Sequence, residues 1–478
     1  MIGKKGSMNE THDLVIIGGG SAGLTGASFA AQLGARVALV DKQRIGGDCT
    51  WSGCVPSKAL IKAAEVAHQM RTAQRYGLSP VEPKVDLKVV MDRVRAVIAD
   101  VYHEESPEAL RADGIDVFLG GARFLDPHTL VAGDTTLSTR KVLIASGAHP
   151  FIPSLRGLEE VDYFTYESIW ELETLPRRLL VVGGGQVGCE MAQAFQRLGA
   201  EVTLVASGDR LLPRDDPAAS RVLAEALAGE GVKIIYDARA ELVWQDGDGI
   251  HIGAGGNGLV GDALLLASGR RPNVKDLDLE KAGVVYDDRG IQVDDNLRTS
   301  QQHIYAAGDC TGGFQFTHYA GWQAAMAVRN ALLPGASKGV TDRVPWTTFT
   351  DPEVAHVGLT EAQARDRFGN DVRICDWPMA QVDRARTEGD TTGFIKLVHR
   401  KNGTLLGVTI VARRAGEMIH EWIVALDQGI KVGNLSNSIH VYPTYSLAGM
   451  QAAAHIRVDQ LLNGTSGRVV RSLSRLVR

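Results

Sequence analysis

The chain has 478 residues, with 51 lysines and arginines against 56 aspartates and glutamates, which gives a net charge of −5. At about 150 residues per domain this length predicts about three domains, and the acidic balance argues against a nucleic-acid-binding protein. No apolar run of about 18 residues occurs, so no transmembrane helix is expected. Five cysteines are too few for a disulfide framework. We therefore expect a reducing, cytoplasmic compartment, in which closely spaced cysteines indicate catalysis or metal binding.

The first predicted element is an apolar strand at residues 14–17, followed by a glycine-rich turn, a helix and a second strand that ends at Asp41. Glycines in such a turn make it tight, let the backbone reach a pyrophosphate, and let the helix pack closely with its N-terminus facing the anion. Asp41 follows the first of these glycines by 23 residues, where a carboxylate accepts hydrogen bonds from a ribose. The pattern predicts a dinucleotide site, and a tight turn in another α/β protein is the alternative. The three glycines are Gly18, Gly20 and Gly23.

The same pattern returns at residues 179–205, but the position that matches Asp41 is now Ala206. An acid there favours a free ribose 2′-hydroxyl, so its absence, with Ser207 and Arg210 next in the chain, predicts NADPH rather than NADH. Three acids also crowd this loop, and solvated arginines with NADH as the coenzyme are the alternative. The acids are Asp209, Asp215 and Asp216, and the glycines of this second turn are Gly183, Gly185 and Gly188.

Two later segments, one around Gly147 and one around Gly269, are similar in sequence. Each marks the end of a predicted unit that begins with a glycine-rich turn. A strand at residues 304–306 then leads to Asp309, after which the chain is expected to return to the first unit. Alternating apolar residues beyond residue 344 predict an antiparallel sheet. The predicted fold is α/β, with two Rossmann-like, three-layer dinucleotide-binding domains and a C-terminal α+β domain. The predicted boundaries are 1–155 and 276–343 for the first domain, 156–275 for the second, and 344–478 for the third.

Between the two units lie Cys49 and Cys54, bracketed by Gly47 and Gly53. Two cysteines five residues apart form either a redox-active disulfide or half of a metal site, and a metal site would want further cysteines or histidines at regular spacing, which do not follow. Next to two dinucleotide units, a pair that exchanges electrons with a flavin and a nicotinamide is the favoured interpretation. Two unrelated buried cysteines are the alternative.

The motif GGDCTWSGCVPSK at residues 46–58, together with the Gly-Asp at 308–309, resembles the pyridine nucleotide–disulfide oxidoreductases, which include dihydrolipoamide dehydrogenase, glutathione reductase and mercuric reductase. The resemblance extends over residues 13–462. It implies FAD in the first unit, NAD(P)H in the second, and a C-terminal dimerisation domain in a homodimer.

The resemblance also implies roles for single residues. Cys54 matches the flavin-proximal thiolate and Cys49 the interchange thiol that meets the acceptor. Lys58 matches the lysine near flavin N5, and Glu190 matches its ion-pair partner. The expected FAD contacts are Gly18, Gly20, Gly23, Asp41, Gly47, Gly147 and Asp309, and the expected NAD(P)H contacts are Gly183, Gly185, Gly188, Ser207, Arg210 and Gly269.

One departure from the family concerns the acceptor. Relatives that reduce organic disulfides carry His-Pro-Thr-x-x-Glu, whereas here Tyr442 stands at the histidine position and Leu447 at the glutamate position. A phenol, with a pKa near 10, is no equal of a histidine as an acid–base group at pH 7. Mercuric reductases also place a tyrosine near this position, so a metal ion or a quinone is the expected acceptor. Residues 467–478 nevertheless contain no cysteine and none precedes Cys49, so the terminal cysteine pair and the metal-capture domain of mercuric reductases are not expected here.

Two alternatives to this function stay open. One is a dihydrolipoamide dehydrogenase or other organic-disulfide reductase that uses His440, although a structural role for His440 is favoured. The other is a flavin-containing redox sensor with little turnover. The remaining cysteines are expected to be structural, and no resident metal is predicted; these cysteines are Cys189, Cys310 and Cys375.

The C-terminal tail places four arginines on one helical face. A solvated helix is the favoured interpretation, and contact with an anionic membrane or a partner is the alternative. The four are Arg468, Arg471, Arg475 and Arg478.

Overall fold

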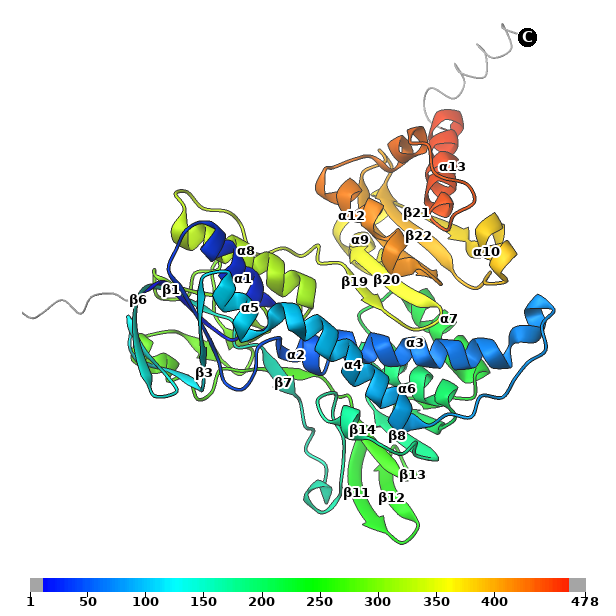
Figure 1. The fold of residues 1–478 in the computed structure, drawn as a ribbon. Coiled ribbons are helices and arrows are strands. Elements are labelled where there is room, and N and C mark those ends of the chain that lie inside the picture. The colour runs from blue at the N-terminus through cyan, green and yellow to red at the C-terminus, as the bar shows by residue number, and fades with distance from the viewer. Residues whose placement is uncertain (1–11, 464–478) are drawn as a thin grey trace, which may run out of the picture.

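The apolar run at residues 14–17 forms part of a seven-stranded sheet in the computed structural model, which describes residues 12–463 (Figure 1). The strand order is β3-β2-β1-β6-β5-β4, and β18 pairs with β6 on a separate branch. Strands β1, β2, β3, β6 and β18 are joined in parallel, whereas β4, β5 and β6 pair antiparallel. The strands are β1 (His12–Ile17), β2 (Val37–Asp41), β3 (Ile115–Leu119), β4 (Ala122–Asp126), β5 (Thr129–Ala132), β6 (Thr135–Ile144) and β18 (Ile304–Ala306).

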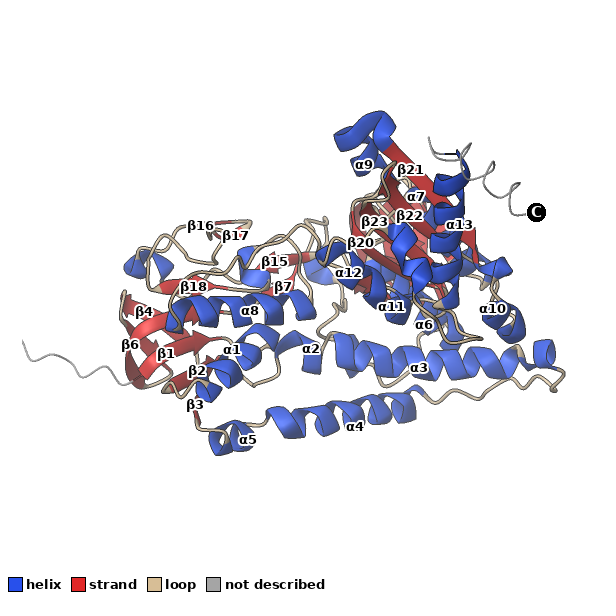
Figure 2. Cartoon of the chain, turned by 90° about the horizontal axis from the view of Figure 1, so that it is seen from above, coloured by secondary structure: helices blue, strands red, loops and turns tan. Residues whose placement is uncertain are grey.

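Helices α1 (Ser21–Gln32) and α8 (Thr317–Leu332) pack together on this sheet, although almost 300 residues of sequence lie between them (Figure 2). The strand side chains explain the sheet's place in the core, because Leu14, Val15 and Ile16 are fully buried. β18 brings the chain back to the first sheet after the second glycine-rich unit is complete.

Two long helices, α3 (Cys54–Arg71) and α4 (Leu87–Glu105), run side by side away from the first sheet (Figures 1 and 2). α3 also packs against α6 (Gln186–Leu198) of the second unit, and the apolar side chains of all three helices share one hydrophobic cluster. The cysteine motif therefore lies at the start of a helix that bridges two sheets. Two short helices belong to this region, α2 (Gly47–Trp51) and α5 (Pro107–Ala112).

The second unit is a four-stranded parallel sheet of order β10-β9-β8-β14, with α7 (Pro217–Gly229) next to it. A three-stranded antiparallel sheet, β11-β12-β13, extends from it. The strands are β8 (Arg178–Val182), β9 (Glu201–Val205), β10 (Lys233–Ile235), β11 (Ala240–Asp246), β12 (Gly249–Ala254), β13 (Asn257–Gly261) and β14 (Ala263–Leu266).

The C-terminal part is a five-stranded antiparallel sheet of order β19-β20-β23-β22-β21, covered by helices (Figure 2). Its strands are β19 (Trp346–Thr348), β20 (Glu353–Gly358), β21 (Val372–Pro378), β22 (Phe394–Arg400) and β23 (Leu405–Ala412). Its helices are α9 (Glu361–Phe368), α10 (Asp383–Glu388), α11 (Ala415–Met418), α12 (His420–Asp427) and α13 (Leu447–Asn463). The paired short strands elsewhere are β7 (Ala148–Pro150) with β15 (Arg270–Pro272), and β16 (Tyr286–Asp287) with β17 (Gly290–Ile291).

The predicted fold class is confirmed, with a Rossmann-like sheet of parallel strands in each of the first two units, extended in the first by antiparallel strands, and with a C-terminal α+β part. The domain boundaries given above stay a prediction. Within residues 12–463, no helix combines the length and the apolar character that a bilayer crossing requires. The arginines predicted to share one face of the tail lie outside the described residues.

Candidate active site

The first glycine-rich turn is tight enough to require glycine at two positions. Gly18 has φ +106°, and a Cβ there would lie 2.2 Å from the carbonyl oxygen of Ala145. A Cβ on Gly23 would lie 1.8 Å from the carbonyl oxygen of Gly18, so only glycine lets α1 approach the turn. Asp41 accepts a hydrogen bond from the Gly19 N–H at 2.7 Å, which places its carboxylate beside the turn, as expected for a ribose-binding acid.

The second turn repeats this geometry, because a Cβ on Gly188 would lie 1.8 Å from the carbonyl oxygen of Gly183. By contrast, apart from the adjoining backbone, no atom of residues 12–463 lies within 4 Å of where a Cβ of Gly185 or Gly269 would stand. Gly185 and Gly20 are the N-caps of α6 and α1, and neither helix has a side-chain cap. The backbone N–H groups of both helix starts are therefore open toward a ligand, which fits a bound pyrophosphate. These two cradles fit FAD and NAD(P)H.

The two segments that echo each other in sequence meet in the structure. β7 follows Gly147 and pairs antiparallel with β15, which follows Gly269. The Phe151 N–H donates to the Gly269 carbonyl at 2.9 Å, and the Asn273 N–H donates to the Gly147 carbonyl at 2.9 Å. The ends of the two dinucleotide-binding units are thus joined directly.

The loop after β9 presents fewer carboxylates to the coenzyme than the sequence suggests. Asp215 accepts a hydrogen bond from the Trp346 indole at 2.8 Å, and Asp216 forms an ion pair with Lys396 at 3.0 Å. Both carboxylates therefore face the C-terminal part, and the expectation that they crowd the coenzyme loop is wrong. Ser207 and Asp209 stay exposed on that loop.

Arg210 is half-buried in the same loop. One of its terminal nitrogens donates to the Pro213 carbonyl at 3.0 Å. Its Nε is buried without a hydrogen-bond partner among the residues that the structure describes. The guanidinium therefore keeps donor capacity next to the coenzyme loop.

Cys49 on α2 and Cys54 at the start of α3 are both free thiols here. Gly47 presses the cysteine segment against the first glycine-rich turn, because a Cβ there would lie 2.6 Å from the Cα of Gly20. The sulfur of Cys54 lies 3.3 Å from the hydroxyl of Thr317, the first residue of α8. The structure thus brings the cysteine pair to the flavin-binding cradle.

The two thiols differ in acidity. The pKa of Cys54 is lowered to about 6, first by the hydrogen bond with Cys49 and then by the Thr317 hydroxyl and the Lys58 ammonium, while burial and the Glu190 carboxylate oppose this shift. The same hydrogen bond, together with burial, raises the pKa of Cys49 above its ordinary value. Near neutral pH the pair therefore holds a thiolate at Cys54 and a thiol at Cys49.

Lys58 and Glu190 form the ion pair that the resemblance implies, with Nζ 2.9 Å from Oε2. Glu190 lies on α6 with 7% of its side chain exposed. Its second oxygen accepts the Phe349 backbone N–H at 2.8 Å, and the Phe349 ring centroid lies 4.4 Å from Lys58 Nζ. Sequence reasoning did not find Phe349, because it contacts the pair from a segment 159 residues beyond Glu190.

A second cluster that sequence reasoning missed is centred on Arg270. Its guanidinium bonds to Asp48, next to Cys49, and forms a 3.0 Å ion pair with Asp309. The Tyr166 ring lies under the guanidinium, and its hydroxyl donates to Asp48 at 3.1 Å. Burial raises the pKa of Asp309, and Arg270 opposes that rise. The expected FAD acid is thus tied to the cysteine segment, and the only signal in the sequence was the arginine that follows Gly269.

The Tyr442 loop is placed differently. Tyr442 is 65% exposed, and its hydroxyl donates to Asp383 at 3.1 Å, whereas Leu447 is buried. His440 bonds to Glu421 through Nε2 at 2.8 Å and to the Ser438 carbonyl through Nδ1 at 3.0 Å, so both ring nitrogens are engaged. Figures 1 and 2 show the start of α13 well apart from α2 within one chain. Within the described residues, no group of three or more histidine, cysteine or carboxylate side chains is arranged to hold a metal ion.

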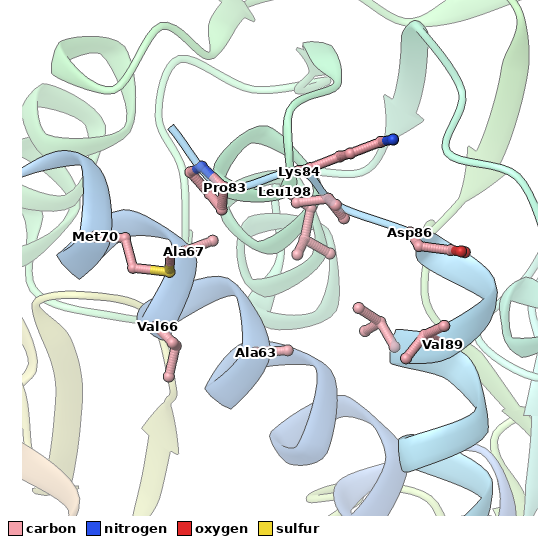
Figure 3. A pocket seen from close by; sticks show the side chains of 11 residues that line it. Ala63, Val66, Ala67, Met70, Pro83, Lys84, Asp86, Val89 and Leu198 are labelled. Atoms are coloured by element: carbon pink, nitrogen blue, oxygen red, sulfur yellow. The ribbon is translucent and has the colours of Figure 1, made fainter. Parts of the chain in front are cut away.

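A hollow of about 270 Å³ lies between the far end of α3 and the start of α4 (Figure 3). Its walls are mostly apolar, and its lining contains no cysteine or histidine. Because Cys54 lies at the opposite end of α3, this hollow is separate from the cysteine pair. Lining residues include Ala63, Val66, Ala67, Met70, Val89 and Leu198.

Comparison with known proteins agrees with this geometry. The profile described as "Pyridine nucleotide-disulphide oxidoreductase" matches residues 12–324, and that of its dimerisation domain matches residues 344–453. A mercuric reductase from Bacillus cereus is 36% identical over 442 residues, covering 91% of this chain and 70% of the relative. A dihydrolipoyl dehydrogenase from Thermus scotoductus is 35% identical over 479 residues, covering 95% of this chain and 100% of the relative.

Among solved structures, the Cu(II) complex of the HOCl-induced flavoprotein disulfide reductase RclA from Escherichia coli superposes with a TM-score of 0.84 at 30% identity. The match covers 94% of this chain and 100% of that one.

Proposed function

The chain belongs to the pyridine nucleotide–disulphide oxidoreductase family, and on that premise we propose that it uses NADPH to reduce the Cys49–Cys54 pair and that the resulting dithiol reduces a thiol-binding metal ion. Membership makes it an FAD-dependent disulfide oxidoreductase that uses NAD(P)H, with a C-terminal domain of the dimerisation type. The acceptor, the coenzyme preference and the residue roles below are proposals.

The residues named above divide the work between them. FAD, when bound in the first cradle, supplies two-electron transfer between NAD(P)H and the cysteine pair. Cys54, held as a thiolate near Thr317 and Lys58, is the flavin-side sulfur. Cys49 is the sulfur that meets the acceptor, and Glu190 fixes the Lys58 ammonium.

Electrons and protons balance when the reduced cysteine pair is oxidised by a metal ion. Near neutral pH the disulfide takes up two electrons and one proton, because the reduced pair is a Cys49 thiol and a Cys54 thiolate. When the disulfide forms again, the pair releases that proton and gives two electrons to the acceptor. The acceptor is either one Hg²⁺ ion, which becomes the metal, or two Cu²⁺ ions, which become Cu⁺. A metal ion leaves without taking up a proton, so this half-reaction needs no general acid at position 442.

The observation that carries this proposal is the environment of Tyr442. Its hydroxyl is bonded to Asp383, and buried Leu447 offers no carboxylate to orient an acid. Reduction of an organic disulfide needs a proton on the departing thiol, and general acid catalysis is typically worth about 10²–10⁴-fold in rate. A thiol-binding metal acceptor therefore fits the site better. The mercuric reductase relative and the Cu(II) complex of the structural relative support the same choice.

An organic-disulfide reductase that works through His440 is the second candidate, and a dihydrolipoyl dehydrogenase relative favours it. His440 does have a carboxylate partner, Glu421, but its other nitrogen bonds to the Ser438 carbonyl, which leaves no free ring nitrogen for a substrate. The intact Lys58–Glu190 ion pair near the cysteines favours an enzyme that still transfers electrons over a redox sensor with little turnover.

NADPH is the proposed reductant because of the second cradle. Ala206 stands where an acid would reject the 2′-phosphate, and Asp215 and Asp216 face away from the loop. Arg210 and Ser207 are left to meet the phosphate.

The experiment is NADPH oxidation by the holoenzyme with Hg²⁺, Cu²⁺, a soluble quinone, lipoamide and glutathione disulfide offered in turn. A Cu⁺ chelator reports the copper product directly. We expect metal-dependent turnover that Cys49→Ser abolishes. Fast lipoamide reduction by the wild-type enzyme, without metal-dependent turnover, would overturn the proposed acceptor.

A further inference from the structure

The segment that follows β19 lies along one face of α6. That face carries Glu190, Gln193 and Arg197, spaced three and four residues apart. The Asp351 N–H donates to Gln193 Oε1 at 2.7 Å, and Gln193 Nε2 donates back to the Asp351 carbonyl at 2.8 Å. The Gln193 side chain thus pairs with both the N–H and the carbonyl of Asp351 and fixes the position of the segment along α6.

Arg197 closes the other end of this contact. Its guanidinium forms ion pairs with Glu230 at 2.6 Å and with Asp351 at 2.9 Å, and its side chain is only 5% exposed. A buried guanidinium with two carboxylate partners is costly to break, because removing one partner leaves an uncompensated charge. Segment 349–351 is therefore held firmly on the helix that carries Glu190.

Phe349 begins this segment and contacts both members of the ion pair near Cys54. Its N–H holds one oxygen of Glu190 at 2.8 Å while the other oxygen meets Lys58 at 2.9 Å. Its ring lies 4.4 Å from Lys58 Nζ, within the range of a cation–π interaction. The residue belongs to the C-terminal part of the chain, whereas Lys58 and Glu190 come from α3 and α6.

We propose that Phe349, docked on α6 through Gln193 and Arg197, is a positioning residue that fixes the Lys58 ammonium beside Cys54 and so sets how readily Cys54 forms its thiolate. This inference rests on the thiolate role that the proposed function gives to Cys54. The Lys58 side chain is 36% exposed with the ring in place. Without the ring, more water reaches the ammonium, Lys58 samples more conformations, and its field at the sulfur is screened further.

The other groups that act on Cys54 are known from the structure. The Cys49 thiol comes from α2, Glu190 from α6 and the Thr317 hydroxyl from α8. Glu105, at the end of α4, acts on the pair through Cys49. A change of the Phe349 side chain keeps the backbone N–H that holds Glu190 and removes the ring that contacts Lys58, so the expected shift is assigned to Lys58.

The test uses the long-wavelength charge-transfer absorbance that a Cys54 thiolate is expected to give with oxidised FAD, and titrates it against pH in the Cys49→Ser holoenzyme. A second readout is the alkylation rate of Cys54 by iodoacetamide, measured by mass spectrometry. Phe349→Leu is expected to raise the midpoint by about half a pH unit in both measurements, about a threefold change in the ratio of thiolate to thiol. Phe349→Tyr, which keeps a ring, is expected to restore the original midpoint.

The matched control is Phe368→Leu, which removes a ring that lies over Arg367 and Arg400 on the C-terminal part and leaves the cysteine site untouched. Phe349→Met gives a second ring-free variant should Phe349→Leu fold poorly. An unchanged midpoint in both ring-free variants would overturn the positioning role while leaving the proposed function intact. A Cys49→Ser background without a titrating thiolate at Cys54 would overturn both.

Discussion

At the scale of single residues, the environment of the cysteine pair predicts the pH at which Cys54 becomes a thiolate. The pKa of Cys54 is lowered first by its hydrogen bond with Cys49 and to a smaller extent by Thr317 and Lys58, against burial, which raises it. Its pKa of about 6 lies below the ordinary thiol value, so the thiolate is present above that pH and is lost as the pH falls through it.

Removing the Cys49 donor therefore has a predicted direction. In the two-electron-reduced holoenzyme, whose cysteines are reduced and whose FAD is oxidised, the charge-transfer absorbance is expected to fade as the pH drops through about 6. Cys49→Ala should move that midpoint upward, because the strongest stabilising hydrogen bond is lost, whereas Cys49→Ser keeps a donor and should shift it less. Cys54→Ser should abolish the band. A band that survives in Cys54→Ser would show that the two sulfur roles are reversed.

Changes at Tyr442 and Leu447 test the proposal that this enzyme reduces organic disulfides slowly because it lacks the family's histidine and glutamate. Tyr442→His with Leu447→Glu restores the family's histidine and carboxylate spacing. Lipoamide reduction is expected to rise roughly tenfold, at or below the low end of the usual gain from general acid catalysis. Tyr442→His alone should gain less, because an unoriented ring samples unproductive rotamers.

Leu447 is only 7% exposed, so the introduced carboxylate costs stability unless the new imidazole pairs with it. The melting temperature is measured alongside the rate for this reason. A wild-type enzyme that already reduces lipoamide at a rate the double variant cannot improve would refute the explanation and return attention to His440.

Ala206 is the residue on which the coenzyme preference depends. Ala206→Glu places a carboxylate near the proposed 2′-phosphate position, and the repulsion is expected to raise the KM for NADPH by about tenfold more than that for NADH, about 1.4 kcal/mol. Steady-state kinetics with both coenzymes measures this ratio. Because Ala206 is buried against Gly184, thermal unfolding serves as the control for folding. A wild-type preference for NADH would contradict the argument and implicate Asp209.

At the scale of elements, α7 shows how one side chain serves two purposes. Asp216 caps the helix by accepting the Ala218 N–H at 2.9 Å, and it also pairs with Lys396 of β22. Both carboxylate and ammonium are buried, and Lys396 has a second partner in Glu361 at 3.3 Å. Asp216 thus caps the beginning of a helix of the second unit, and its ion pair ties that helix to the C-terminal sheet.

Two substitutions separate these purposes. Asp216→Asn keeps the cap but removes the charge, and should lower the free energy of unfolding by about 2 kcal/mol, because one partner of a buried ion pair is lost while Glu361 remains. Asp216→Ala should cost about 1 kcal/mol more, since the cap is lost as well. Denaturant unfolding measures both. Asp86→Asn, at the exposed cap of α4, is the matched control and should be nearly neutral; equal losses at both caps would refute the ion-pair argument.

At the scale of the whole molecule, local patterns could be predicted and distant contacts could not. The glycine turns and the cysteine motif each lie within about 30 residues, where backbone geometry limits the choice of residue. Asp48 and Arg270 meet across 222 residues, and Asp215 and Trp346 across 131. A local sequence pattern does not reveal contacts between residues so far apart in the chain. For this reason the role of Phe349 was not predicted, and Asp215 and Asp216 were expected at the coenzyme loop although they contact the C-terminal part.

Two large apolar side chains next to Tyr442 are exposed to solvent in the single chain. Ile439 is fully exposed and Val441 is 75% exposed, although both are large and apolar. They lie in the part of the chain that matches the dimerisation domain. A second copy that covers this loop would remove the apolar surface from water, which favours association.

Ile439→Asp with Val441→Asp is therefore expected to shift the protein from dimer to monomer, because a charge buried at an interface without a partner is strongly unfavourable. Sedimentation velocity measures the change, and circular dichroism checks that the fold is retained. Val285→Asp is the matched control, since Val285 is 49% exposed but lies outside the dimerisation region. It should leave the dimer intact. If the double variant sediments as a dimer at all concentrations, this loop is not part of the interface, and the exposed side chains around Tyr442 serve another contact.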